Sequence, residues 1–111
     1  MKATTKNVDG IEVIKIEGKI TIGSGDVQLR DVILATLDKG NSSILLDMGG
    51  VTTLDSSGIG ELVGAYTTVT NRGGKLKLLH IPTKISDLLS VTQLITVFEV
   101  YEDEAQAVAS F

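Results

Sequence analysis

The fold of this protein is decided by residues 43–66, which read SILLDMGGVTTLDSSGIGELVGAY. The stretch begins with a short apolar run, residues 43–48, bounded by the pair Gly49-Gly50, and such a run is typical of a strand buried on both faces of a sheet. After Asp55-Ser56-Ser57-Gly58, the residues with helical spacing are Ile59, Leu62, Val63, Tyr66 and Thr70. The stretch therefore predicts a buried strand followed directly by an amphipathic helix that ends near residues 71–74.

A strand-to-helix pattern also precedes this stretch. Residues 11–17 alternate roughly between apolar and charged side chains, which predicts a half-buried strand, and residues 19–22 predict a second strand. The sequence Gly-Ser-Gly at residues 23–25 breaks the pattern. From Asp26 the period becomes that of a helix, and Ser24 or Asp26 is a candidate for its cap. The apolar face of this helix is predicted to be Leu29, Val32, Ile33, Thr36 and Leu37.

The C-terminal third continues the alternation of strands and helices. Residues 75–79 alternate as a strand, and residues 85–92 have helical spacing after Thr83, which is a candidate cap. Residues 96–101 are β-branched and aromatic and predict a strand, and a short last helix is expected over residues 102–109.

The predicted order of elements is β-β-α-β-α-β-α-β-α. Alternating strands and helices imply an α/β fold, here a mixed, mostly parallel sheet of about five strands with four helices. We expect the opening pair of strands to supply one antiparallel edge. Because the chain contains no internal repeat or linker, residues 1–111 are expected to form one domain.

The composition restricts the possible functions. The 111 residues include no Cys, which excludes disulfides and thiolate metal sites, and the single histidine, His80, cannot form a histidine metal site alone. The net charge of −4 and the isoelectric point of about 4.8 argue against binding to nucleic acid or to an anionic membrane surface.

The expected location is the cytoplasm. Residues 1–10 lack the apolar stretch of a signal peptide. No apolar run in the sequence approaches the ~18 residues that a membrane-spanning helix needs. We therefore expect no membrane insertion.

Three catalytic or phosphate-binding interpretations are weaker than a structural one. Residues 23–25 could cradle a phosphate, but they lack the dinucleotide fingerprint and the Walker lysine, so a strand-to-helix turn is favoured. Ser57 lies outside a G-x-S-x-G motif, and only His80 could serve as its base. Asp47 ends a predicted strand as the phosphorylated aspartate of a receiver domain does, but the acidic pair that would hold Mg²⁺ is missing. We therefore expect no catalytic residue and no metal site, and a protein that is not an enzyme.

The sequence Asp55-Ser56-Ser57-Gly58 holds more polar groups than a helix cap requires. One Ser or Asp suffices to accept a bond from a free backbone N–H, a contribution of about 0.5–2 kcal/mol. A second interpretation is that a hydroxyl is displayed at the helix start for phosphorylation, since a phosphate there meets free N–H groups and the positive end of the helix dipole. In that case Gly58 would let a kinase approach the hydroxyl closely.

Two glycines lie on the helix surface that leads away from Ser57. Gly60 and Gly64 follow it at positions i+3 and i+7. Each glycine in an exposed helix costs about 1 kcal/mol relative to Ala. Two explanations remain open: a partner backbone packs closely against this face, or the glycines pack against the protein's own sheet.

These features resemble the STAS-domain family, and within it the bacterial anti-sigma factor antagonists. The resemblance covers nearly all 111 residues. It is most specific over residues 44–66, where a buried strand ending in Asp precedes Asp-Ser-Ser-Gly at a helix start, and it continues over residues 81–108.

The resemblance implies that Ser57 is the phosphorylated residue, with Asp55, Ser56 and Gly58 as its neighbours in the motif. It implies an anti-sigma factor that is also a serine kinase as the partner, and a phosphatase that reverses the modification. The unphosphorylated antagonist would sequester the anti-sigma factor and free a sigma factor. Because ATP belongs to the kinase, we expect no cofactor in this chain.

Two departures from the family pattern are present, and the first bears on partner choice. Thr21 stands where family members commonly carry an acidic residue, on a surface that the family uses for partners, so Thr21 and the nearby Ser24 are candidate partner-binding residues. Gln93 replaces a glycine that is often found late in the region of the third helix.

A second function fits the same resemblance. STAS domains also serve as constitutive subunits of stress-signalling scaffolds or lipid-transport complexes. In such a subunit, Asp55-Ser56-Ser57-Gly58 would only cap the helix. Addition of one phosphate by a kinase separates the two hypotheses.

Overall fold

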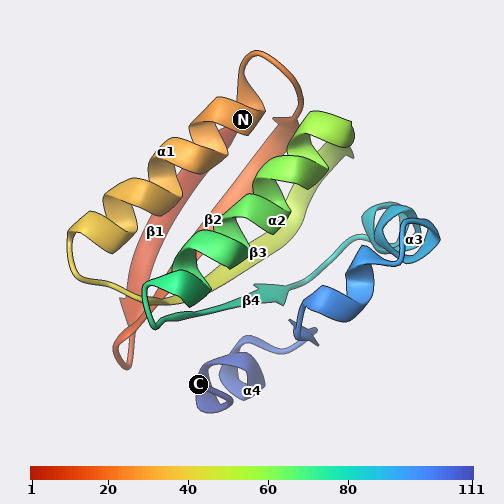
Figure 1. Cartoon of the computed structure of the whole chain (residues 1–111). Helices are drawn as coiled ribbons and strands as arrows, with labels where there is room; N and C mark the ends of the chain where they lie inside the picture. The colour runs from red at the N-terminus through yellow and green to blue at the C-terminus, as the bar shows by residue number, and fades with distance from the viewer.

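A five-stranded sheet forms the centre of the molecule in a computed structural model that describes residues 1–111. The strand order follows the chain, β1-β2-β3-β4-β5, and only the pair β1–β2 is antiparallel (Figure 1). The strands are β1 (Lys2–Val8), β2 (Ile11–Ile20), β3 (Ser43–Leu54), β4 (Lys75–Leu79) and β5 (Val100–Tyr101). The predicted α/β class, the mixed sheet and the antiparallel edge are confirmed.

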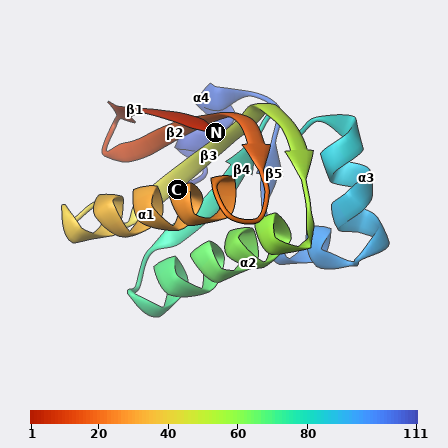
Figure 2. The ribbon, with the colours of Figure 1, turned by 90° about the horizontal axis from the view of Figure 1, so that it is seen from above.

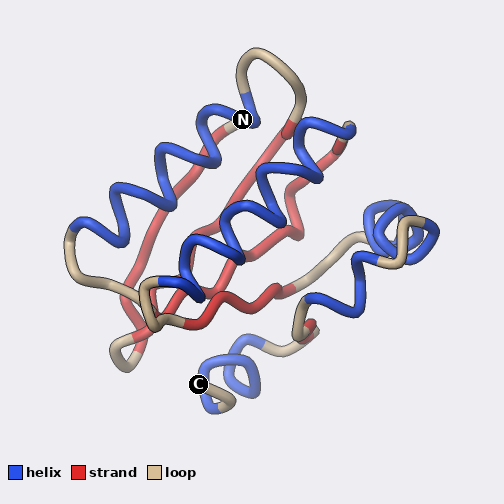
Figure 3. The backbone as a smooth tube through the Cα atoms, in the orientation of Figure 1, coloured by secondary structure: helices blue, strands red, loops and turns tan.

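The helices cover the two faces of the sheet unequally. They are α1 (Gly25–Asp38), α2 (Ser56–Asn71), α3 (Thr83–Val91) and α4 (Glu104–Ala109), with a 3₁₀ turn, η1 (Leu94–Val97), before β5. Helices α1 and α2 lie side by side on one face (Figures 2 and 3), and α4 lies on the other (Figure 2). None of the helices combines the length and the apolar character that crossing a membrane requires.

The core is divided by the sheet, as expected for parallel strands buried on both faces. A cluster of 19 buried residues lies between the sheet and helices α1 to α3, and it includes Leu46 of β3. Its neighbour in β3, Leu45, belongs to a cluster of five buried residues on the other face, where Ala107 of α4 covers it. Both leucines are fully buried, which confirms the prediction for the apolar run of residues 43–48.

In the N-terminal half, the structure differs from the prediction for two strands. Residues 11–17 and 19–22 were expected to form separate strands, but residues 11–20 form the single strand β2, with a register shift and a positive φ of 94° at Gly18. The first strand is instead residues 2–8, whose side chains are mostly exposed and therefore do not alternate. The Asp9-Gly10 turn, with φ values of 52° and 84°, joins β1 to β2 as a tight hairpin.

Strand β3 and the C-terminal segment differ from prediction as well. Strand β3 continues through Gly49-Gly50 to Leu54, so Asp47 lies within the strand and not at its end. The strand expected over residues 96–101 is confirmed only at its end, because β5 contains just Val100 and Tyr101 and the turn η1 includes Thr96 and Val97. Thr83 is the first residue of α3 and does not cap it with its side chain.

Strand β4 is buried along almost its whole length, so its side chains do not alternate between buried and exposed positions. Residues 76–79 are all buried, including Lys77, which is 4% exposed. The Lys77 ammonium donates to the carbonyl oxygen of Ser110 at 2.9 Å and to its hydroxyl oxygen at 3.0 Å, and it lies 3.4 Å from a carboxylate oxygen of Glu99. These three acceptors satisfy the buried charge and fix the C-terminal segment against the sheet.

Gln93, which follows α3, has the left-handed conformation, with φ 62° and ψ 9°. This conformation costs a residue with a side chain about 1–2 kcal/mol, and glycine is common at this position after a helix. We expect Gln93→Gly to raise the free energy of unfolding by about 1 kcal/mol, since the added freedom of the unfolded chain offsets part of the gain. Thermal unfolding should show a midpoint about 4–8 °C higher.

A matched control for this substitution lies three residues earlier. Ser90 is exposed and helical, so Ser90→Gly should lower stability by a fraction of a kcal/mol. Equal effects of the two substitutions would contradict the conformational explanation.

Candidate functional site

Asp55 caps helix α2. It precedes the helix in an extended conformation, and its Oδ1 accepts a hydrogen bond from the backbone N–H of Gly58 at 2.8 Å. Its Oδ2 accepts a second bond, from the backbone N–H of Ile22 at 2.9 Å. These bonds, first from Gly58 and then from Ile22, hold the pKa of Asp55 below its ordinary value, so the carboxylate is charged near neutral pH.

The two serines are the first residues of α2. Because Asp55 makes the capping bond, neither hydroxyl is used in the cap. Ser56 is exposed and Ser57 is half-buried. The structure thus places Ser57 within the first turn, where backbone N–H groups lack helical partners.

The structure gives a different reason for Gly58 from the one that the sequence indicated. Gly58 is buried, and a Cβ at this position would collide with the carbonyl oxygen of Ile20 and lie 2.7 Å from Cδ1 of Leu54. The expectation that Gly58 opens the hydroxyl to a kinase is wrong. The glycine lets the start of α2 pack directly on the end of β2.

The turn between β2 and α1 lies beside this helix start. The hydrogen bond from Ile22 to Asp55 brings residues 21–24 next to the serines, although the two segments are 33 positions apart in sequence. Thr21, expected in a strand, lies just beyond β2, is half-buried, and its carbonyl accepts from the N–H of Asp26 at 3.1 Å. Ser24 is exposed and occupies the cap position before α1, but its side chain makes no capping hydrogen bond.

Gly60 and Gly64 face away from the sheet. Both are exposed, and a Cβ at either position would meet no heavy atom within 4 Å. The explanation that they pack against the protein's own sheet is therefore wrong. Thr70, predicted on the buried face of the same helix, is exposed as well, whereas Ala65 and Val69 are buried there.

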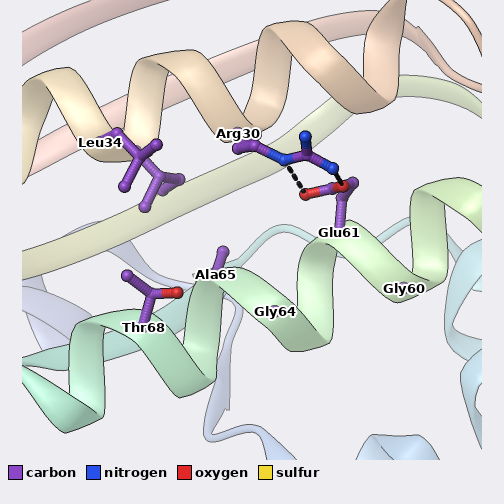
Figure 4. A pocket seen from close by; sticks show the side chains of 8 residues that line it. Arg30, Leu34, Gly60, Glu61, Gly64, Ala65 and Thr68 are labelled. Carbon is purple, nitrogen blue, oxygen red and sulfur yellow. Dashed lines mark hydrogen bonds and ion pairs between the residues drawn. The ribbon is translucent and has the colours of Figure 1, made fainter.

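These two glycines line a groove between α1 and α2 (Figure 4). Its other lining residues are Arg30, Ile33, Leu34, Glu61, Ala65 and Thr68. Arg30 reaches across from α1 and pairs through two hydrogen bonds with the carboxylate of Glu61, one of them from Nε to Oε2 at 3.2 Å. The hydrogen bond with Glu61 raises the pKa of the Arg30 guanidinium. The sequence contained no indication of this ion pair, because the two residues lie on different helices.

His80 and Asp47 form a separate pair. Nδ1 of His80 lies 3.3 Å from Oδ1 of Asp47, which also accepts from the N–H of Gly49 at 3.0 Å. His80 thus pairs with Asp47.

One exposed residue beside Ser57 was missed in the sequence. Ile22 was expected in a strand, but it lies in the turn after β2 and its side chain is 73% exposed. An isoleucine directly before Gly23-Ser24-Gly25 could have indicated an apolar residue in a turn.

Comparison with known proteins places this geometry in a family. A model of the STAS domain matches residues 2–107. The chain is 21% identical over 98 residues to the anti-sigma F factor antagonist of Paenibacillus polymyxa, covering 88% of this chain and 84% of that one. It is 28% identical over 95 residues to the anti-sigma-B factor antagonist of Bacillus subtilis, covering 86% and 84%.

A solved structure agrees at the level of the fold. The Bacillus cell fate determinant SpoIIAA in its phosphorylated form superimposes with a TM-score of 0.74 at 19% identity, covering 98% of each chain. The family model spans nearly the whole chain, and the strand order and the Asp-Ser-Ser-Gly helix start agree with it. This protein belongs to the STAS domain family.

Proposed function

We propose that this protein is an anti-sigma factor antagonist that is switched by phosphorylation of Ser57. In its unphosphorylated form it binds an anti-sigma factor that is also a serine kinase, and a sigma factor is released. Phosphorylation ends the binding, and a phosphatase restores it. The observation that carries the proposal is the Ser57 hydroxyl in the first turn of α2, outside the cap that Asp55 makes.

The geometry at Ser57 suits a modified as well as an unmodified side chain. A phosphate on this hydroxyl lies near free backbone N–H groups and the positive end of the helix dipole, which favour negative charge by up to ~2 kcal/mol. The fold therefore tolerates both states. A switch of this kind works through the surface around Ser57 and needs no rearrangement of the sheet.

The partner surface in this proposal extends from Ser57 in two directions. Thr21 and Ser24 lie on the turn that Asp55 holds beside it. Gly60 and Gly64 continue along the exposed side of α2. The absence of side chains at the two glycines lets a partner backbone approach this helix closely.

We expect a kinase to phosphorylate Ser57 and not Ser56. The protein is incubated with ATP and each anti-sigma factor kinase of its source genome, and intact mass and peptide maps are recorded. One phosphate should appear on the wild-type protein and on Ser56→Ala, and none on Ser57→Ala. A phosphate on Ser56, with Ser57→Ala still modified, would refute the assignment. If no kinase modifies the protein, the constitutive-subunit function replaces the switch.

Gly64→Gln tests the surface along α2. Because the position is exposed and helical, glutamine should keep the thermal midpoint or raise the free energy of unfolding by up to ~1 kcal/mol. The added side chain should weaken binding to the anti-sigma factor by about tenfold, through loss of about 1.4 kcal/mol. Calorimetric titration measures the affinity.

The matched control for this substitution is Thr70→Gln, an exposed position near the other end of the same helix. Its affinity should stay at the wild-type value. If Gly64→Gln also binds like wild type, the two glycines are not part of the interface.

A further inference from the structure

Asp55 does more than a helix cap requires. A cap needs one acceptor oxygen for the backbone N–H of Gly58, and a serine at this position could supply it. The carboxylate adds a second acceptor, and this oxygen bonds the N–H of Ile22 at 2.9 Å. The lowered pKa of Asp55, caused first by the Gly58 bond and next by the Ile22 bond, keeps both oxygens available as acceptors.

The second bond fixes a residue that the core does not hold. The Ile22 side chain is 73% exposed, so its contacts with the protein contribute little to its position. It lies in the turn of residues 22–24, which includes Gly23 with a positive φ of 87°. The backbone of this turn is therefore tied to the start of α2 through Asp55, while the side chain points away from the core.

This turn carries one of the few large apolar side chains that the fold leaves exposed. The large apolar side chains that the fold leaves exposed are Ile22, Val27, Val91 and Val100. Two of these four lie within six residues of each other, on the turn and on the first turn of α1. An exposed isoleucine whose backbone N–H is held by a hydrogen bond is suited to insertion into a partner, because little freedom of the backbone is lost on binding.

We propose that Asp55 is a positioning residue that holds Ile22 beside Ser57, and that Ile22 is an anchor that inserts into an apolar recess on the anti-sigma factor. The inference rests on the proposed function. The recess lies next to the kinase active site, since Asp55 is only two residues from the phosphoacceptor. The kinase therefore recognises this substrate through Ile22 in addition to the Ser57 hydroxyl that the kinase modifies.

Two substitutions separate the cap from the positioning role. Asp55→Ser keeps one oxygen for the Gly58 N–H and removes the acceptor for the Ile22 N–H. Ile22→Ser removes the apolar side chain and keeps its backbone N–H. Ile22→Val is the conservative variant, and Val100→Ser, on the far edge strand β5, removes an exposed apolar side chain elsewhere.

The affinities of these variants for the kinase that phosphorylates the wild-type protein form a double-mutant cycle. We expect Ile22→Ser to weaken binding by about tenfold or more, as burial of an aliphatic side chain predicts, and Asp55→Ser to weaken it severalfold. The double variant should bind no more weakly than Ile22→Ser, because Asp55 acts through Ile22. Ile22→Val should restore most of the affinity, and Val100→Ser should not change it.

Amide hydrogen exchange tests the positioning role without a partner. In the wild-type protein and in Ile22→Ser, the N–H of residue 22 should be protected. In Asp55→Ser this protection should be lost while that of the Gly58 N–H is kept. A purely capping Asp55 would leave exchange at Ile22 unchanged.

Three results would overturn the inference: additive effects in the cycle, wild-type affinity of Ile22→Ser, or retained protection of Ile22 in Asp55→Ser. Each leaves the proposed function intact, because the wild-type protein still binds and is phosphorylated. If the wild-type protein binds no anti-sigma factor kinase, the proposed function fails, and the inference fails with it.

Discussion

Phosphorylation of Ser57 is expected to lower the affinity for the anti-sigma factor by about 100- to 1000-fold, a loss of roughly 3–4 kcal/mol. The phosphate adds about −1.5 to −2 charges near pH 7 to a chain whose net charge is already −4. Asp55 lies close by and is charged, because its pKa is lowered. A pair of like charges about 4 Å apart repels by roughly 1 kcal/mol in water-like surroundings and about 4 kcal/mol in a half-buried interface.

Two features of the site determine how this loss arises. Glu61, the other acidic residue near Ser57 in sequence, is paired with Arg30, which reduces its share of the repulsion. The larger share comes from Asp55 and from the desolvation of the phosphate in an interface formed around a neutral hydroxyl. The positive end of α2 offsets the new charge within the fold, so the free protein should keep its structure.

Calorimetric titration of the anti-sigma factor with unphosphorylated and phosphorylated protein measures this loss. Ser57→Asp should show part of the effect, with circular dichroism and amide exchange close to wild type. Thr70→Asp, which adds one charge at the other end of α2, is the control and should change the affinity little. Broad changes in exchange across the sheet on phosphorylation would show that the switch acts through the fold, contrary to this mechanism.

Gly58→Ala is expected to lower the free energy of unfolding by about 3 kcal/mol. Overpacking of a filled site typically costs about 1–3 kcal/mol, and this site is at the upper end because the new Cβ meets the backbone carbonyl oxygen of Ile20. A side chain could rotate away, but this oxygen moves only if α2 separates from β2. The thermal midpoint should fall by about 12–24 °C.

The control for this substitution is two residues away on the same helix. Gly60 is exposed, and a Cβ there would have no heavy atom within 4 Å, so Gly60→Ala should stabilise the protein by up to ~1 kcal/mol. Denaturant unfolding of both variants gives the comparison. Similar stabilities for Gly58→Ala and Gly60→Ala would mean that the start of α2 does not pack on β2 as described.

Periodicity predicted the helices well, because their packing follows one apolar face. Leu29, Ile33, Leu62 and Leu89 are buried as the spacing indicated. The strands were harder to predict, for three physical reasons. The side chains of β1 are mostly exposed and show no alternation of buried and exposed positions. The glycines at 49–50 lie inside β3, although glycine usually weakens or ends a strand. The β-branched residues near Thr96 favour a strand by their propensity, but the folded chain forms a 3₁₀ turn there.

The helix start at residues 55–58 was predictable, but the contacts around it were not. The motif at residues 55–58 indicated a polar helix start by sequence alone. The bond from Asp55 to Ile22 joins segments 33 positions apart, and only the order of the strands brings them together. The role of Gly58 was misjudged for the same reason, since its neighbour Ile20 belongs to strand β2, far away in the sequence.

The central claim, that this protein frees a sigma factor only while Ser57 is unphosphorylated, is tested most directly by displacement. A preformed complex of the anti-sigma factor with its sigma factor is titrated with each form of the protein, and free sigma factor is measured by transcription from a promoter that depends on it. The unphosphorylated form should release the sigma factor, and the phosphorylated form should require about 100- to 1000-fold higher concentration. Equal release by both forms, or release by neither, would contradict the account.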